Sequence, residues 1–102
     1  MDASITVRRG DIAALCRLFG VKRLDLFGSA ATGNFDPQRS DFDFMVDLGE
    51  RSSAAYVDAY FGLQESLEKL LGRPVDLVTE RSVTNPYRRE NILHTRQLLY
   101  AA

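Results

Sequence analysis

The sequence predicts a small α/β domain in which a mixed β-sheet is flanked by helices. Stretches with apolar residues at three- and four-residue spacing alternate along the chain with shorter stretches rich in Val, Leu and Phe. Gly, Pro and Asn separate these stretches, as expected for the turns of a layered domain. The chain has 102 residues, and we expect residues 1–102 to form one domain without internal repeats or linkers.

A helix is expected at residues 9–20, with Gly20 at its end. Its apolar face gathers Ile12, Leu15, Cys16 and Phe19. Cys16 is the one cysteine of the chain, so it has no partner for a disulfide within the chain. Its position on the apolar face predicts a small buried core residue.

A strand and a tight turn are expected next. Residues 22–27 alternate in polarity, which is typical of a short strand, and Gly28 ends the strand abruptly. Ser29 can cap a single helical turn, which Gly33 would end. Residues 34–40 are rich in Asn, Asp, Pro and Ser, and they predict a loop.

The longest predicted helix lies in the second half of the chain. Residues 41–48 indicate a second strand, and a helix over residues 54–71 follows it. Ser52 or Ser53 is a suitable cap for this helix. Its apolar stripe is expected to consist of Val57, Tyr60, Phe61, Leu67, Leu70 and Leu71.

Three shorter elements complete the prediction. Gly72 suits the position after the long helix, and Pro74 keeps the chain from re-entering a helix. Residues 75–79 predict a third strand. The Asn-Pro pair that opens residues 85–94 is a good helix start, and residues 97–100 suit a short closing strand.

The charge balance argues against a domain that holds DNA mainly through its phosphates. Lys and Arg number 13 against 14 Asp and Glu, for a net charge of -1, whereas such domains usually carry a basic excess. Eleven of the 13 cations are Arg, which suits bidentate contact with phosphate or carboxylate. No apolar run is long enough for a membrane span, and no signal peptide is recognisable. We therefore expect a cytoplasmic protein without direct DNA binding or membrane attachment.

Asp41 and Asp43 are the most informative residues. Because residues two apart in a strand point to the same face, both carboxylates would project together while Phe42 and Phe44 pack into the core. Two like charges at this spacing repel, and nothing adjacent in the sequence neutralises them. A divalent cation resolves the repulsion, and hard oxygen ligands select Mg²⁺ or Mn²⁺.

Asp76 repeats this arrangement in the third predicted strand. Its neighbours Val75 and Leu77 would face the core, so its carboxylate faces the other way. If this strand pairs with residues 41–48, three carboxylates converge. Such a ligand set is typical of a two-metal site, in which one ion activates the attacking oxygen and the other holds the triphosphate. Asp47 also faces outward, but it lies farther along its strand and is expected at the surface.

Gly28 and Ser29 indicate a phosphate-binding turn beside the acidic pair. A glycine lets the backbone approach a ligand closely, and the following helical turn presents N–H groups that bind phosphate oxygens. Two competing motifs fail. Asn34 and Phe35 stand where a P-loop needs Lys and Ser/Thr. A calcium loop starting at Asp41 would lack its Gly at the sixth position and its Glu at the twelfth.

These motifs resemble a known signature. The stretch from Leu26 to Gly33, followed by Ser40-Asp41-Phe42-Asp43, is similar to the Gly-Ser turn and Asp-x-Asp signature of the polymerase-β-like nucleotidyltransferase superfamily. Residues 70–79 and 85–93 resemble the third-carboxylate strand and the final helix of its minimal nucleotidyltransferase (MNT) branch. The resemblance covers nearly the whole chain.

The resemblance implies a nucleotidyltransferase fold and a magnesium–nucleotide site. The nucleotide would be bound by Gly28 and Ser29, and two Mg²⁺ ions, or Mn²⁺ in their place, would be held by the catalytic residues Asp41, Asp43 and Asp76. Members of this branch are commonly antitoxins that transfer AMP from ATP to a tyrosine of a HEPN-domain ribonuclease toxin. This chain departs from the branch at Thr32, where many members carry Arg.

Two classes of function are compatible with the sequence. In the first, the chain is an enzyme that uses ATP or another nucleoside triphosphate to adenylylate its cognate HEPN toxin, with which it forms a hetero-oligomer. In the second, it neutralises the toxin by binding alone. The three acidic residues favour the enzyme, because a pure binding module has no reason to keep carboxylates that repel one another. Transfer to a small molecule is a third alternative, which the absence of an acceptor domain disfavours.

Overall fold

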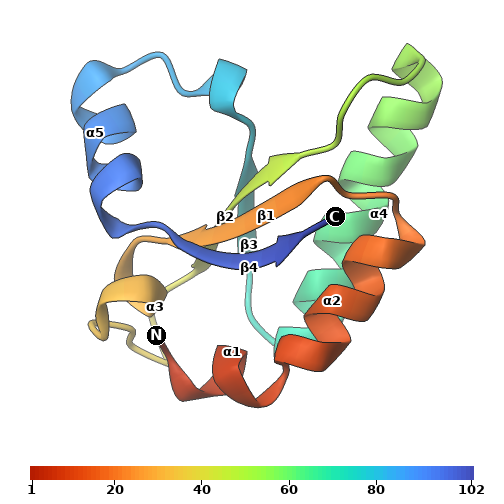
Figure 1. The fold of residues 1–102 in the computed structure, drawn as a ribbon. Coiled ribbons are helices and arrows are strands. Elements are labelled where there is room, and N and C mark those ends of the chain that lie inside the picture. Colours follow the sequence, from red (N-terminus) through yellow and green to blue (C-terminus); the bar gives the residue numbers. More distant parts are fainter.

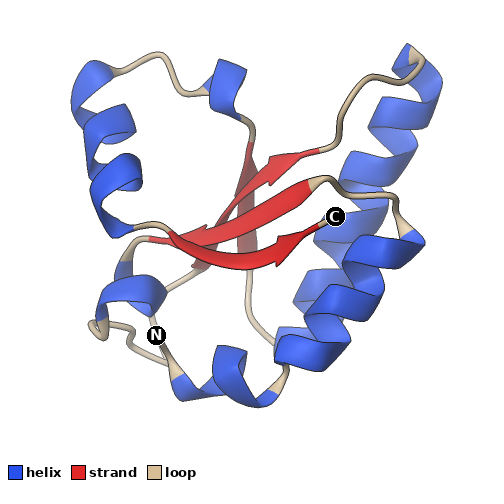
Figure 2. Ribbon diagram, viewed as in Figure 1, coloured by secondary structure: helices blue, strands red, loops and turns tan.

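The computed structural model describes residues 1–102 as a four-stranded sheet flanked by helices (Figure 1, Figure 2). The strands are β1 (Arg23–Phe27), β2 (Phe42–Asp47), β3 (Val75–Val78) and β4 (Gln97–Ala101). The helices are α1 (Ala3–Val7), α2 (Arg9–Leu18), α3 (Ser29–Thr32), α4 (Ser53–Leu71) and α5 (Pro86–Thr95), with a short 3-10 helix, η1 (Glu80–Ser82). The predicted α/β class and every predicted strand are therefore confirmed.

The sheet is mixed, as predicted. Its strand order is β3-β2-β1-β4. β1 pairs antiparallel with both β2 and β4, whereas β2 and β3 are parallel. A parallel pair needs a long crossover connection, and α4 provides it. This crossover brings Asp76 into the same sheet position as Asp43, because the two residues are paired in register.

The main core fills the face of the sheet that α2 and α4 cover, and Figure 1 shows both helices on the same side of the sheet. Phe42 and Phe44 of β2 are almost fully buried in it. A smaller cluster lies on the opposite face beneath η1 and α5. It consists of Phe27, Met45, Val78, Val83 and Ile92. The second cluster matters for the site because it anchors α5 over the face that Asp43 and Asp76 share.

Capping residues set the bounds of the two long helices. The Ser52 hydroxyl accepts a hydrogen bond from the Ala55 N–H at 3.2 Å, so Ser52 rather than Ser53 is the cap of α4. Gly72 ends α4 in the left-handed conformation with φ 68°. The Asn85 side chain accepts from two N–H groups in the first turn of α5. The Asn-Pro start predicted for this helix is therefore confirmed.

The structure corrects the predicted apolar stripe of α4. Val57 and Phe61 are exposed, with 50% and 59% of their surface accessible. The buried residues of the helix are Ala59, Leu63 and Leu67. These residues repeat every fourth position and form a narrow stripe that faces the sheet. The prediction is confirmed for Leu67, which is buried, and Tyr60, Leu70 and Leu71 are partly buried and pack against the same core.

Three further features of the structure are not predicted from the sequence pattern. The N-terminal segment forms α1, which is too short to show a periodicity. β2 begins at Phe42, so Asp41 lies directly before the strand rather than in it. Asp25 is only 3% exposed, and both its oxygens accept hydrogen bonds from the Arg23 guanidinium at 3.0 and 3.2 Å. None of the helices combines the length and apolarity that a membrane span requires.

Candidate active site

The turn after β1 is built around a glycine that no other residue can replace without strain. Gly28 has φ 73° and ψ -151°, a conformation that is essentially restricted to glycine. A Cβ atom on this residue would lie 2.4 Å from Oδ2 of Asp43. The Gly-Ser turn and the acidic strand are therefore packed directly against each other, and the missing side chain leaves the space that the carboxylate occupies.

Strand register brings two of the predicted carboxylates together. Asp43 is paired with Phe27 of β1 on one side and with Asp76 of β3 on the other. Asp41 lies two residues earlier, just before β2, and its side chain is 54% exposed. As predicted, Phe42 turns into the core while the acidic residues beside it do not.

The three carboxylates interact electrostatically. The pKa of Asp43 is raised from 3.8 to about 6, chiefly by burial and also by the negative charges of Asp76 and Asp41, while the nearby Arg88 opposes the shift. Burial penalises the ionised form because it removes water from the carboxylate, and like charges penalise it by repulsion. A positive charge near Asp43 would therefore favour its ionised form.

Two arginines from distant parts of the sequence compensate Asp76 and Asp41. Nη2 of Arg88 donates to Oδ2 of Asp76 at 3.0 Å. Nη2 of Arg73 lies 4.0 Å from Oδ1 of Asp41. Arg73 also donates two hydrogen bonds to the Ser40 carbonyl, which fixes the chain just before Asp41. Neither contact is visible in the sequence, because Arg88 comes from α5 and Arg73 follows α4.

Residues 12–99 match the family described as nucleotidyltransferase domain. The chain belongs to the nucleotidyltransferase family. A relative from Methanocaldococcus jannaschii, named as a protein adenylyltransferase, is 42% identical over 74 residues, which cover 72% of each chain. These matches confirm the superfamily resemblance that the Gly-Ser turn and the Asp-x-Asp pair indicate.

Solved structures agree with this assignment. A chain described as a minimal nucleotidyltransferase superposes with a TM-score of 0.72 at 34% identity, and the match covers 95% of both chains. A chain in the complex of the tri-AMPylated HEPN toxin of Shewanella oneidensis with its MNT antitoxin superposes with a TM-score of 0.62. That match covers 95% of this chain and 72% of the other at 20% identity, so it shows a shared fold.

The donor set of this nucleotidyltransferase fits a hard divalent cation. All three candidate ligands are carboxylates, and Mg²⁺ and Mn²⁺ prefer oxygen ligands. Burial and the negative charges of Asp76 and Asp41 raise the pKa of Asp43, and a bound cation would oppose this shift. The side chains are not gathered at ligand spacing, since no group of three acidic, His or Cys residues lies close enough to hold an ion.

The turn that faces the acidic residues of the nucleotidyltransferase is tightly hydrogen-bonded. The N–H groups of Ala31 and Thr32 both donate to the Gly28 carbonyl, at 3.1 and 3.2 Å. The Gly28 N–H donates to the Thr95 hydroxyl at 3.5 Å, which ties the turn to the end of α5. The Thr32 hydroxyl folds back onto the carbonyls of Gly28 and Ser29. Thr32 is uncharged, so it brings no positive charge to this turn.

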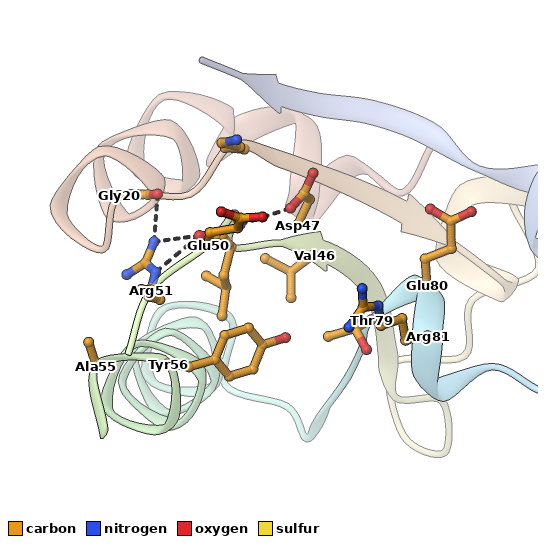
Figure 3. Close-up of a pocket in the computed structure, with 13 residues that line it drawn as sticks. Gly20, Val46, Asp47, Glu50, Arg51, Ala55, Tyr56, Thr79, Glu80 and Arg81 are labelled. Atoms are coloured by element: carbon orange, nitrogen blue, oxygen red, sulfur yellow. Dashed lines mark hydrogen bonds between the residues drawn. The ribbon is translucent and has the colours of Figure 1, made fainter. Parts of the chain in front are cut away.

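A hollow of about 1320 Å³ lies at the opposite end of the sheet from Gly28 and contains none of the acidic site residues (Figure 3). Its walls include Lys22, Asp47, Arg51, Tyr56 and Arg81. Asp47 is exposed, as predicted. Figure 3 shows the Arg51 guanidinium turned toward backbone carbonyls rather than into the hollow. Arg51 donates to the carbonyls of Phe19, Gly20 and Leu48, so it joins the end of α2 to the end of β2.

Proposed function

We propose that this nucleotidyltransferase is a magnesium-dependent protein adenylyltransferase and acts as the antitoxin of a HEPN-type toxin. It would transfer AMP from ATP to a tyrosine hydroxyl of that toxin. The observation that carries the proposal is the placement of Asp43 between the Gly28 turn and Asp76. The name of the Methanocaldococcus relative and the AMPylated toxin bound by the Shewanella MNT antitoxin support the acceptor class.

Asp41, Asp43 and Asp76 are the residues that would hold the metal. When bound, two Mg²⁺ ions, or Mn²⁺ in their place, would lower the pKa of the acceptor hydroxyl and neutralise charge on the phosphates. Asp43 is the central ligand in this proposal, because it is flanked by Asp76 across the strand pair and by Asp41 along the chain. Asp41 and Asp76 are both about half exposed, which leaves their oxygens accessible.

Gly28 and Ser29 would position the nucleotide. The positive φ of Gly28 turns the chain sharply beside Asp43, and the turn that follows would bind the phosphates through backbone N–H groups and the Ser29 hydroxyl. In the reaction, the acceptor oxygen forms a bond to the α-phosphorus of ATP, and the bond from that phosphorus to the bridging oxygen breaks. Pyrophosphate leaves, and the hydroxyl proton is released. Catalysis would rest on positioning and on charge stabilisation at the phosphorus.

The exposure of the site favours an acceptor carried on another protein. The carboxylates of Asp41 and Asp76 face solvent, so a tyrosine on a partner surface can reach them from outside. Near the site, the first turn of α5 projects Tyr87, which is 86% exposed, together with Arg88 and Arg89. We expect the hetero-oligomer interface with the toxin to include this turn and the tail to Tyr100.

The test is a transfer assay with the purified partner. The chain is incubated with Mg²⁺, labelled ATP and a purified HEPN-type candidate partner, and the label is located by mass spectrometry. Wild type should add one AMP to a partner tyrosine and release pyrophosphate. Asp41→Ala, Asp43→Ala and Asp76→Ala should each lose activity by orders of magnitude and still co-elute with the partner in size-exclusion chromatography.

Binding alone is the second candidate function, and one observation favours it. Thr32 contributes no cation to the site, and Arg88 is engaged by Asp76. A toxin-protection assay in cells separates the two candidates. If the triple alanine variant protects cells as well as wild type does, chemistry is dispensable and the binding function replaces the enzymatic one. A nucleotidyltransferase that labels only small-molecule acceptors would contradict both.

A further inference from the structure

Arg88 is the cation closest to the acidic site, and it holds Asp76 by a single contact. Its Nη2 donates to Oδ2 of Asp76 at 3.0 Å, and this is its one side-chain hydrogen bond within the protein. Both side chains are about half exposed, at 48% and 47%. The guanidinium is thus partly free, and most of its N–H donors remain available to a further acceptor.

The first turn of α5 fixes the backbone from which Arg88 projects. The Asn85 side chain accepts from the N–H groups of Tyr87 and Arg88, at 2.9 and 3.1 Å. Arg89 is anchored on the other side, because its Nη2 donates to Glu80 of η1 at 2.9 Å. Ile92 of the same helix is buried in the cluster beneath it. The backbone at residue 88 is therefore held in place, and movement at this position is confined to the long side chain.

The charge on the acidic site determines which group Arg88 pairs with, and this charge depends on whether a cation and a nucleotide are bound. Without a bound cation, Arg88 offsets the repulsion between Asp76 and Asp43, and it opposes the rise in the pKa of Asp43. A divalent cation held by these carboxylates would make this compensation unnecessary and would repel the guanidinium. The nearest new acceptors would then be the phosphates of a bound nucleotide, for which the Arg fork is well suited.

We propose that Arg88 is the counter-ion of the metal-free acidic site and that it transfers from Asp76 to the triphosphate when metal and nucleotide bind. This inference rests on the proposed function, because it requires the acidic residues to be the metal site. Arg88 is thus a competitor of the metal and a ligand of the nucleotide in the same chain.

The two roles predict opposite effects of one substitution. In Arg88→Gln, metal binds carboxylates that no longer pair with an arginine. Mn²⁺ alone should therefore bind roughly two- to fivefold more tightly, the range that an exposed ion pair supports. The non-hydrolysable analogue AMP-PNP, added at saturating Mn²⁺, should bind roughly tenfold or more weakly because a charged hydrogen bond to phosphate is lost.

Isothermal titration calorimetry of the whole chain measures both affinities without the toxin. Arg89→Gln is the matched control, because it removes the neighbouring arginine of the same helix, which pairs with Glu80 outside the site. It should change neither affinity. Arg88→Lys keeps the positive charge but not the planar fork, so it should bind Mn²⁺ like wild type and AMP-PNP more weakly. This variant decides the matter if Arg88→Gln does not fold.

The proposal is supported if Arg88→Gln binds Mn²⁺ more tightly and AMP-PNP more weakly than wild type, while Arg89→Gln changes neither affinity. Shifts in the same direction, or affinities equal to those of the control, overturn it. For the lysine variant, AMP-PNP binding equal to wild type overturns the transfer to phosphate. A wild-type chain that binds neither Mn²⁺ nor AMP-PNP would refute the proposed function itself. A chain that binds both but leaves the toxin unlabelled would refute only the acceptor.

Discussion

Substitution of Gly28 by Ala tests whether the turn and the acidic strand are built as one unit. Alanine at this position would have to adopt φ 73° and ψ -151°. Its Cβ would lie 2.4 Å from Oδ2 of Asp43. The backbone strain alone costs about 1–3 kcal/mol for a residue other than glycine. Turning the Asp43 carboxylate away from its preferred rotamer adds about 0.5–1.5 kcal/mol.

The two costs together predict a loss of about 2–4 kcal/mol in the free energy of unfolding. In a domain of this size, 1 kcal/mol lowers Tm by roughly 4–8 °C. Gly28→Ala should therefore unfold roughly 10 °C or more below wild type in a thermal scan followed by circular dichroism. Gly33→Ala is the matched control. Its φ is 86°, but no atom lies within 4 Å of the added methyl group, so it should cost only about 1–2 kcal/mol of left-handed strain.

A double-mutant cycle separates collision from strain. If the methyl group collides with Asp43, then Gly28→Ala should cost less in an Asp43→Ala background than in wild type, and the coupling should exceed about 0.5 kcal/mol. Gly33→Ala should show no such coupling to Asp43. The reasoning is refuted if Gly28→Ala melts at or above Gly33→Ala, or if its cost is the same in both backgrounds.

Three further predictions concern ionisation, packing and reactivity. Because the folded pKa of Asp43 is about 6 against an ordinary 3.8, its ionisation destabilises the metal-free fold fully above pH 6, and the cost fades as pH falls toward 3.8. Asp43→Asn should thus be at least as stable as wild type at pH 7 in EDTA, and Mg²⁺ should not stabilise it. If its midpoint of urea unfolding lies well below that of wild type, the aspartate has a structural role instead. Arg51→Ala should lose about 1–3 kcal/mol of stability through its carbonyl contacts, with AMP-PNP affinity in calorimetry unchanged; a drop in that affinity would contradict the separation of hollow and site. Burial raises the pKa of Cys16 to about 11, so a thiol reagent at pH 8 should label it only in denaturant, and rapid native labelling would refute its burial.

The sequence predicts the elements of this fold well because most of them are marked by local chemistry. The start of α5 is fixed by Asn85 and Pro86, and the end of α4 by Gly72. These signals depend on a few consecutive residues. The apolar stripe of α4 is predicted less well, because Val57 and Phe61 are apolar without facing the sheet. Hydrophobicity alone does not state which side of a helix its neighbours will cover.

The candidate site follows the same division. Phe42 and Asp43 predict their own orientations through the two-residue period of a strand. The side-by-side placement of Asp43 and Asp76 depends on the pairing of β2 with β3. The sequence does not predict this pairing, so the convergence of the carboxylates could be stated only on the assumption that the two strands pair. Arg88 could not be assigned to Asp76 beforehand, because that contact requires α5 to fold back over the sheet. Ion pairs between separate elements leave no periodic signal in the sequence.

The parallel pairing of β2 and β3 has a consequence for tolerance to insertions and deletions. One residue added or removed between Gly72 and Val75 would shift β3 by one position against β2. The shift in register would place an aliphatic residue beside Asp43. It would also turn the carboxylate of Asp76 into the hydrophobic core under α4. An insertion or deletion in this short connection would therefore disrupt the candidate site and lower the stability of the fold together.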